Sequence, residues 1–251
     1  MSAVARTVAR EPELAGQTVI VIGGSGGIGF EVARQAREEG AELIVAARDT
    51  GRLRRAASEL GATSSAAFDA TDPAALERFF RELPRPVDHV MVTAGRPRYA
   101  RLADMDYAEM RDALNEHLML ALQVARNAPG KVRAGGSLTF MGGTGGRRPG
   151  PGRTIASAVT AAMPALIANL ALELAPIRVN LIAPGFVDTP LSASFLGDQL
   201  DQRRRQLRDT LPIGRVVGPA DVAALALHLM TNTAVTGATY DIDGGEQFVA
   251  A

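Results

Sequence analysis

Short apolar strands alternate with helices along almost the whole chain, and this alternation limits the possible folds more than any other feature. Apolar runs expected as strands cover residues 18–22, 42–46, 66–68, 87–92, 137–141, 178–182 and 239–242. Helices are expected over 28–39, 51–60, a stretch that begins at Pro73, 103–127, 154–175 and 219–230. Apolar strands separated by helices indicate a parallel sheet that is covered on both faces. Right-handed crossovers then predict an α/β, doubly wound Rossmann fold with a seven-stranded parallel sheet and helices on both faces.

The chain of 251 residues shows no internal repeat and no linker, so we expect a single domain over 1–251. Residues 1–15 are expected as an N-terminal extension, and residues 190–210 as a helical insertion on the substrate side. The first fifteen residues hold no apolar stretch of the kind found in a signal peptide. These features predict a soluble, cytoplasmic protein.

Composition removes several classes of function. Lys+Arg and Asp+Glu balance at 27 each, so no clustered excess of positive charge suggests a nucleic-acid or membrane partner. Cysteine is absent, which excludes disulfides, thiolate catalysis and cysteine-containing metal sites, and we expect no metal. The apolar stretch 155–175 contains Pro164, Asn169 and Glu173, and we interpret it as a helix buried in a subunit interface rather than a membrane span.

A glycine-rich turn follows the first expected strand and opens the first expected helix. It reads Gly23-Gly24-Ser25-Gly26-Gly27-Ile28-Gly29. Glycines in this context let the backbone turn sharply and let a pyrophosphate approach the amide groups of a helix N-terminus. An ordinary flexible loop is the alternative, but five glycines in seven residues favour dinucleotide binding.

The end of the second strand indicates which dinucleotide. An acidic residue there would bind the ribose hydroxyl of NAD, whereas an arginine would accommodate the 2′-phosphate of NADP. This chain has Ala47 followed by Arg48, and Ser25 could add a hydroxyl donor. We therefore expect NADP(H) as the cofactor and NAD as the less favoured one, with a merely solvated Arg48 as the alternative.

From residue 15 onward the chain resembles the short-chain dehydrogenase/reductase (SDR) family. The resemblance is carried by Gly23-x-x-x-Gly27-Ile28-Gly29, Asp69, Asp88 to Gly95, Arg178-Val179-Asn180, Pro184 to Pro190 and Asp243-Gly244-Gly245. The chain departs from the family pattern at Ile22, where threonine is usual, and at Val92 and Thr93, which replace two asparagines. The resemblance implies cofactor contacts at Gly23, Ser25, Gly26, Gly27, Ile28, Gly29, Arg48, Asp69, Ala70, Ala94, Gly95, Pro184, Gly185, Val187 and Thr189.

The same resemblance implies four catalytic positions, and the usual side chain is missing from each. Family members use a tyrosine, a lysine, a serine and an asparagine, and the matching positions here hold Ala156, Thr160, Gly143 and His117. A shift of the alignment by two residues would place Asn115 at the asparagine position, but the apolar phase of that helix favours His117. Hydride transfer to a carbonyl builds negative charge on oxygen, which needs a proton or a hydrogen-bond donor. A non-standard acid/base is therefore required if the protein turns over.

His117 is the candidate for that group, because imidazole titrates near neutral pH. The alternative is that His117 fills space left by the lost side chains. Tyr99 lies in a loop that lines the substrate side in the family, whereas His89 is expected as a hydrogen-bonded core residue. His228 and Tyr240 are expected to be structural. Arg147 and Arg148 are expected either to bind an anionic substrate or to be solvated.

Three functions remain open from the sequence. The first is an NADP(H)-dependent oxidoreductase that reduces a small carbonyl or quinone-like substrate. The second is a catalytically inactive cofactor-binding or regulatory homologue, and the third is a non-redox lyase or isomerase on the same fold. The helix over 154–175 is apolar nearly all round, and the resemblance implies that it packs against its copy in a homodimer or homotetramer.

Overall fold

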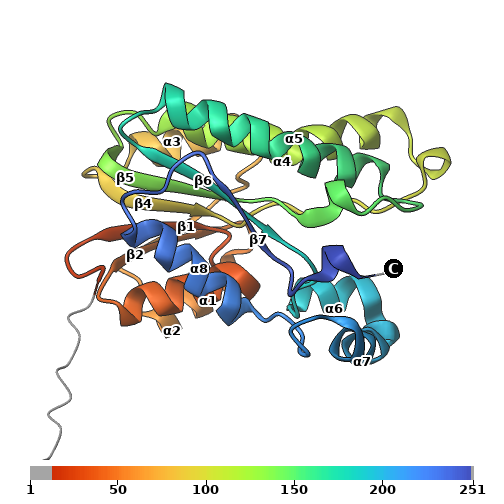
Figure 1. The fold of residues 1–251 in the computed structure, drawn as a ribbon. Coiled ribbons are helices and arrows are strands. Elements are labelled where there is room, and N and C mark those ends of the chain that lie inside the picture. Colours follow the sequence, from red (N-terminus) through yellow and green to blue (C-terminus); the bar gives the residue numbers. More distant parts are fainter. Residues whose placement is uncertain (1–12, 250–251) are drawn as a thin grey trace, which may run out of the picture.

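One parallel sheet organises the computed structural model, which describes residues 13–249 (Figure 1). Its seven strands lie in the order β3-β2-β1-β4-β5-β6-β7. The strands are β1 (Thr18–Ile22), β2 (Glu42–Ala47), β3 (Ser64–Ala67), β4 (Val87–Val92), β5 (Val132–Met141), β6 (Arg178–Pro184) and β7 (Thr239–Ile242). The predicted doubly wound Rossmann fold is confirmed, with the strand order reversing direction between β1 and β4.

Helices cover both faces of this sheet. They are α1 (Gly27–Glu38), α2 (Thr50–Leu60), α3 (Pro73–Arg81), α4 (Tyr107–Asn127), α5 (Thr154–Glu173), α6 (Pro190–Leu196), α7 (Leu200–Thr210) and α8 (Pro219–Thr231). In Figure 1, α3, α4 and α5 lie on one face, and α1, α2 and α8 lie on the other. The short helices α6 and α7 lie beyond the carboxyl ends of the strands, where ligands bind in doubly wound folds.

The alternation of side chains along β1 explains why its residues are apolar throughout. Ile20 and Ile22 enter the core under α3, α4 and α5, whereas Val19 and Val21 enter the core under α1 and α8. Successive side chains of a strand point to opposite faces, so a strand with helices on both sides has no polar face. Burial on both sides fixes its register against β2 and β4.

Several expected boundaries are wrong, each for a local reason. The long helix α4 begins at Tyr107 instead of residue 103, because Asp106 and Glu109 form a capping box there. The strand expected at 66–68 lies at Ser64–Ala67, where small polar residues carry little strand signal. Strand β5 begins at Val132 instead of residue 137, with an irregularity in its pairing to β4.

Two larger segments also differ from expectation. The insertion over 190–210 is two helices, broken at Gly197, whose φ of 49° lies in the left-handed region. The extension expected over 1–15 ends earlier, because Leu14 is fully buried and its amide donates to the carbonyl of Glu39. The remaining part of that extension, residues 1–12, lies outside the described residues.

His89 on β4 is the hydrogen-bonded core histidine that the sequence predicts. Its Nδ1 lies 2.8 Å from Ser137 Oγ, and its Nε2 lies 2.7 Å from Gln17 Oε1. Gln17 donates its amide nitrogen to the carbonyl of Glu13, so its oxygen faces His89 and the imidazole Nε2–H must be the donor. Burial, together with the guanidinium of Arg178, lowers the pKa of His89 to about 4.

We expect this histidine to make folding stability depend on pH. An imidazole in the unfolded chain titrates near 6.5, so between pH 6.5 and pH 4 only the unfolded state binds the extra proton. The free energy of unfolding should therefore fall by up to about 3 kcal/mol as the pH decreases across this window. Urea unfolding of wild type and His89→Leu at pH 7 and pH 4.5 tests this. The variant should be less stable at pH 7 and should lose less stability on acidification, whereas equal losses would contradict the assignment.

Candidate active site and cofactor cradle

The glycine-rich turn lies at the carboxyl end of β1, as predicted, and is closely packed. A Cβ atom added to Gly29 would lie 2.3 Å from the carbonyl oxygen of Gly23, so only glycine permits this approach. Gly23 itself has a φ of 102°, which residues with side chains rarely adopt. The glycines are therefore fixed by the geometry of the turn and do not merely loosen a loop.

The helix that follows this turn begins without a side-chain cap. Gly26 is the N-cap of α1 and offers no side-chain acceptor to the amide groups of the first turn. Uncapped amide groups and the positive end of the helix dipole form a favourable position for a phosphate. A Cβ added to Gly27 would lie 3.8 Å from the side chain of Thr189, so the segment after β6 closes over the turn. This arrangement fits the pyrophosphate of a dinucleotide.

The residues expected to bind the adenosine half lie together at the ends of β2 and β3. Arg48 Nη1 is 3.6 Å from Asp69 Oδ2, and the Arg48 side chain is 73% exposed. Hydrogen bonds from the Thr71 hydroxyl and amide, followed by the charge of Arg48, hold the pKa of Asp69 below its usual range. Arg48 is thus held only by a long ion pair at the edge of the expected cofactor site, and its exposed guanidinium is accessible to an anion.

The remaining expected cofactor residues lie along the same edge of the sheet. Ala94 and Gly95 follow β4, and the Ala94 amide donates to the carbonyl of Ile22 at the end of β1. Gly185, Val187 and Thr189 follow β6, where Val187 pairs with Val217. Because parallel strands end on the same side, the structure brings these segments together with the glycine turn.

The positions matched to the family tyrosine, lysine and serine lie close together and carry no free proton donor. A Cβ added to Gly143 would lie 3.3 Å from Cγ2 of Thr160, which places these two positions side by side. The Thr160 hydroxyl donates to the carbonyls of Ala156 and Ser157 within its own helix. The Ser157 hydroxyl donates to the carbonyl of Gly145. The hydroxyls of Thr160 and Ser157 therefore donate to backbone carbonyls and are not available to a substrate.

His117 on α4 lies against Gly95 at the end of β4. A Cβ added to Gly95 would be 2.9 Å from Nε2 of His117, so the imidazole rests directly on the glycine. Burial lowers the pKa of His117 below its usual value, and the neighbouring Glu116 opposes this shift. The imidazole is therefore neutral at pH 7, with one N–H donor and one acceptor nitrogen.

Arg147 and Arg148 are both paired with carboxylates of the C-terminal part of the chain. Arg147 makes a bidentate ion pair with Asp241 of β7. Arg148 is largely buried, with its Nη1 2.7 Å from Oε1 of Glu246. Both arginines join the loop after β5 to the C-terminal segment, and neither is simply solvated.

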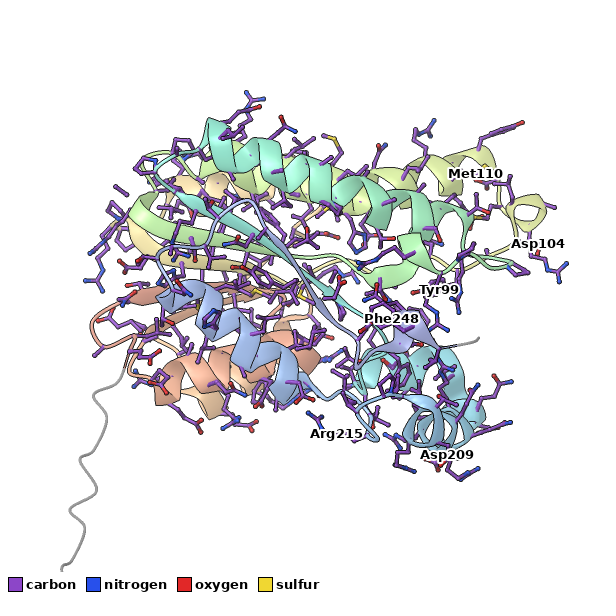
Figure 2. All side chains as sticks on the ribbon, in the orientation of Figure 1. Tyr99, Asp104, Met110, Asp209, Arg215 and Phe248 are labelled. Carbon is purple, nitrogen blue, oxygen red and sulfur yellow. The ribbon has the colours of Figure 1, made fainter. Side chains whose placement is uncertain are left out.

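The other histidines and tyrosines lie away from the expected cofactor site or at its edge. Tyr99 lies on the loop after β4 and packs edge-on against Phe195 of α6, with ring centroids 6.0 Å apart (Figure 2). His228 is exposed at the end of α8, with its Nε2 3.2 Å from Nδ2 of Asn232. Tyr240 is half-buried in β7. Among the described residues, no group of three or more His, Asp or Glu side chains is placed to hold a metal ion.

Two residues of this edge were not found from the sequence. Glu246 is buried, and its Oε1 lies 2.6 Å from Nη2 of Arg203 on α7. Its position directly after Asp243-Gly244-Gly245 was visible, but nothing in the sequence paired it with an arginine 43 residues away. Long-range ion pairs of this kind have no local pattern.

Comparisons with known proteins agree with this geometry. Residues 23–247 match the family model described as enoyl-(acyl carrier protein) reductase. The short-chain dehydrogenase/reductase ATR9 of Stachybotrys chlorohalonatus is 31% identical over 252 residues, which cover 93% of this chain and 98% of that protein.

Solved structures show the same fold along their whole length. The MalC reductase/Diels-Alderase of Malbranchea aurantiaca superposes with a TM-score of 0.88 at 25% identity, covering 95% of this chain and 99% of that one. A small-chain dehydrogenase in complex with NADPH gives a TM-score of 0.80 at 28% identity, covering 92% and 99%. The match to the family model extends from the glycine-rich turn to the C-terminal Asp-Gly-Gly segment. This chain belongs to the short-chain dehydrogenase/reductase family of oxidoreductases.

Proposed function

We propose that the protein is an NADP(H)-dependent oxidoreductase that reduces a small, activated carbonyl or quinone-like compound. The observation that supports this is the contrast between the two walls of the site. The glycine-rich turn and the segment after β6 keep the features that would hold a dinucleotide, whereas the wall that donates the proton in the family carries Ala156, Gly143 and a Thr160 hydroxyl bonded to its own helix. An acceptor that already stabilises negative charge depends less on that missing donor.

Each part of the site has a role in this proposal. The uncapped amide groups at Gly26 and Gly27 hold the pyrophosphate, and the segment 184–189 closes over the nicotinamide end. The bound cofactor supplies the hydride. His117 offers its N–H to the acceptor oxygen, where negative charge develops during reduction. Holding donor and acceptor together provides much of the remaining rate enhancement.

Oxidation of NADPH by the purified protein, measured over a panel of saturated ketones and quinones, tests the proposal. Turnover is expected with quinones and conjugated ketones and not with saturated ketones. Absence of turnover with every compound, despite binding of NADPH, would favour the second candidate, a cofactor-binding protein without turnover. Thr160 stands where the family lysine holds the nicotinamide ribose, and its hydroxyl is bonded to the carbonyl of Ala156. The loss of this ribose contact supports the second candidate.

A non-redox reaction is the third candidate, and one solved relative supports keeping it. MalC is named as both a reductase and a Diels-Alderase. Conversion of a substrate in the absence of any change in NADPH absorbance would favour this candidate over the other two.

The choice of cofactor gives a separate prediction. Arg48 is exposed and lies at the end of β2, where a 2′-phosphate would be placed. NADPH should therefore bind more tightly than NADH, and Arg48→Ala should narrow the difference by removing a charge-assisted contact. Fluorescence titration gives both dissociation constants. Equal constants for the two cofactors in wild type would contradict the preference, and Arg54→Ala provides a control at an exposed residue of the neighbouring helix α2.

Self-association is also proposed. Helix α5 buries Ile155, Val159, Met163 and Ile167 on one side and exposes small apolar residues on the other. By length and composition it is the one described helix apolar enough to cross a membrane, with 33% of its most apolar window buried. A second copy of the protein would cover the exposed side. Light scattering at micromolar concentration should give a dimer or tetramer, and a monomeric mass would contradict this.

A further inference from the structure

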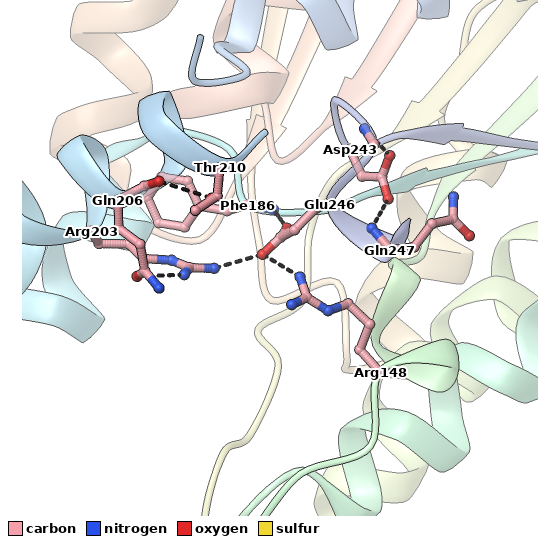
Figure 3. Close-up of polar contacts among 9 residues, drawn as sticks. Arg148, Phe186, Arg203, Gln206, Thr210, Asp243, Glu246 and Gln247 are labelled. Carbon is pink, nitrogen blue, oxygen red and sulfur yellow. Dashed lines mark hydrogen bonds and ion pairs between the residues drawn. The ribbon is translucent and has the colours of Figure 1, made fainter. Parts of the chain in front are cut away.

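A buried carboxylate joins the walls of the site at the carboxyl edge of the sheet (Figure 3). Glu246 Oε1 lies 2.7 Å from Arg148 Nη1 and 2.6 Å from Arg203 Nη2. Glu246 Oε2 accepts a hydrogen bond of 2.9 Å from the backbone amide of Phe186. These three partners come from the loop after β5, from α7 and from the segment after β6, so one side chain connects three separate parts of the site. We call this group the Glu246 clasp.

The local structure around Glu246 holds the carboxylate in place. Asp243 accepts hydrogen bonds from the amides of Gly245 and Gln247, which turn the chain so that Glu246 points inward. Gly185 is the other requirement, because a Cβ there would lie 2.6 Å from Glu246 Oε2. The segment after β6 can therefore approach the carboxylate only because it has glycine at this position.

Helix α7 packs through its buried Leu207 and is attached to the site by this clasp and one neighbouring ion pair. Arg203 also places its guanidinium 5.9 Å from the centre of the Phe186 ring. Arg204 makes a two-pronged pair with Asp188, but that pair is more exposed than the one to Glu246. Ion pairs shielded from water are screened less by salt, so the attachment through Arg203 and Glu246 depends less on ionic strength than the one through Arg204 and Asp188.

We propose that Glu246 is a positioning residue that aligns the segment 184–187 for the cofactor and holds helices α6 and α7 closed over the substrate. The hydrogen bond from the Phe186 amide aligns the segment 184–187, and the ion pair with Arg203 holds α6 and α7 closed. This inference rests on the proposed function, because it assumes that the segment after β6 contacts the nicotinamide end. The two tasks use different oxygens of one carboxylate, so substitutions can separate them.

Three variants separate the two tasks. Arg203→Met removes the attachment of α7 and the guanidinium over the Phe186 ring, but it keeps the hydrogen bond from the Phe186 amide to Glu246. Glu246→Ala removes all three contacts of the carboxylate, to Arg148, Arg203 and the Phe186 amide. Arg205→Met is the matched control, because it makes the same change on the same helix at an exposed residue with no ion pair among the described residues. Hydrogen exchange of residues 190–210 reports on closure, and the NADPH dissociation constant reports on the segment 184–187.

The expected pattern differs for each variant. Arg203→Met should raise exchange in 190–210 about tenfold, the loss expected for one charge-assisted hydrogen bond, and leave the NADPH dissociation constant within about twofold. Glu246→Ala should raise both exchange and the dissociation constant about tenfold. Arg205→Met should change neither.

Other results would overturn the inference. Unchanged exchange in Arg203→Met would show that the clasp does not hold α7. A Glu246→Ala variant with exchange raised equally over the whole chain, or with an unchanged NADPH dissociation constant, would show a purely structural carboxylate. If wild type binds no nicotinamide dinucleotide, the proposed function and the alignment of 184–187 for a cofactor both fail. In that case, faster hydrogen exchange at residues 190–210 in Arg203→Met, but not in Arg205→Met, would still show that the Glu246 clasp holds α7 in place.

Discussion

Replacement of His117 by alanine is expected to lower the rate of quinone reduction by about 10²–10⁴, the usual contribution of a general acid. The imidazole lies on Gly95 at the end of β4, on the edge where the expected cofactor residues gather. The hydroxyls of Thr160 and Ser157 are bonded to backbone carbonyls, so they do not compete for this role. The steady-state rate of NADPH oxidation with 1,4-naphthoquinone measures the effect.

A matched variant and a pH series separate chemistry from packing. His117→Gln keeps a hydrogen-bond donor of similar size but cannot titrate. Because burial lowers the pKa of His117, the imidazolium form becomes populated only below the usual value of 6.5. A rate that uses imidazolium should therefore rise as the pH falls through that region in wild type and stay flat in His117→Gln. Equal rates for wild type and His117→Ala would leave His117 as a packing residue.

Oxidation of simple secondary alcohols is expected to be negligible, and this is the second large effect. Removal of a hydride from an alcohol needs a base at the hydroxyl, and the positions that hold the tyrosine and lysine in the family hold Ala156 and Thr160. Loss of the proton-transfer group alone should lower the rate by about 10²–10⁴ relative to an SDR enzyme with those residues. NADP reduction with 2-propanol or cyclohexanol tests this.

The double variant Ala156→Tyr/Thr160→Lys provides the complementary test. It should gain alcohol oxidation if the site is otherwise intact. Brisk oxidation of alcohols by the wild-type protein would contradict the account, since it would require an active site elsewhere.

The sequence predicted the sheet well because strands buried on both faces leave a strong and local signal. β1 and β4 have the expected bounds, and the glycine turn lies where the pattern places it. The burial of His89 was also predictable, since it interrupts an apolar strand and therefore needs hydrogen-bond partners inside. Helix starts were less predictable, because the capping box at Asp106 outweighs the apolar pattern before it.

The parts of the site that depend on distant partners were not predictable. Arg148 reads as a loop arginine, yet it is paired with Glu246, almost a hundred residues later in the chain.

The direction of the Thr160 hydroxyl follows from helix geometry, because Ser and Thr in helices often donate to a carbonyl one turn earlier. A residue type alone does not tell whether its hydroxyl faces a ligand or its own backbone.

The most direct measurement compares two acceptors of similar shape and different reactivity with the wild-type protein. NADPH oxidation is followed with 1,4-naphthoquinone and with 2-tetralone, a ketone whose carbonyl is not conjugated with the ring, at the same concentrations, each corrected for the reaction without protein. The account predicts that the quinone is reduced faster by at least about 10², because only the saturated ketone depends strongly on the missing proton donor. Equal rates for the two compounds, or reduction of 2-tetralone alone, would contradict it.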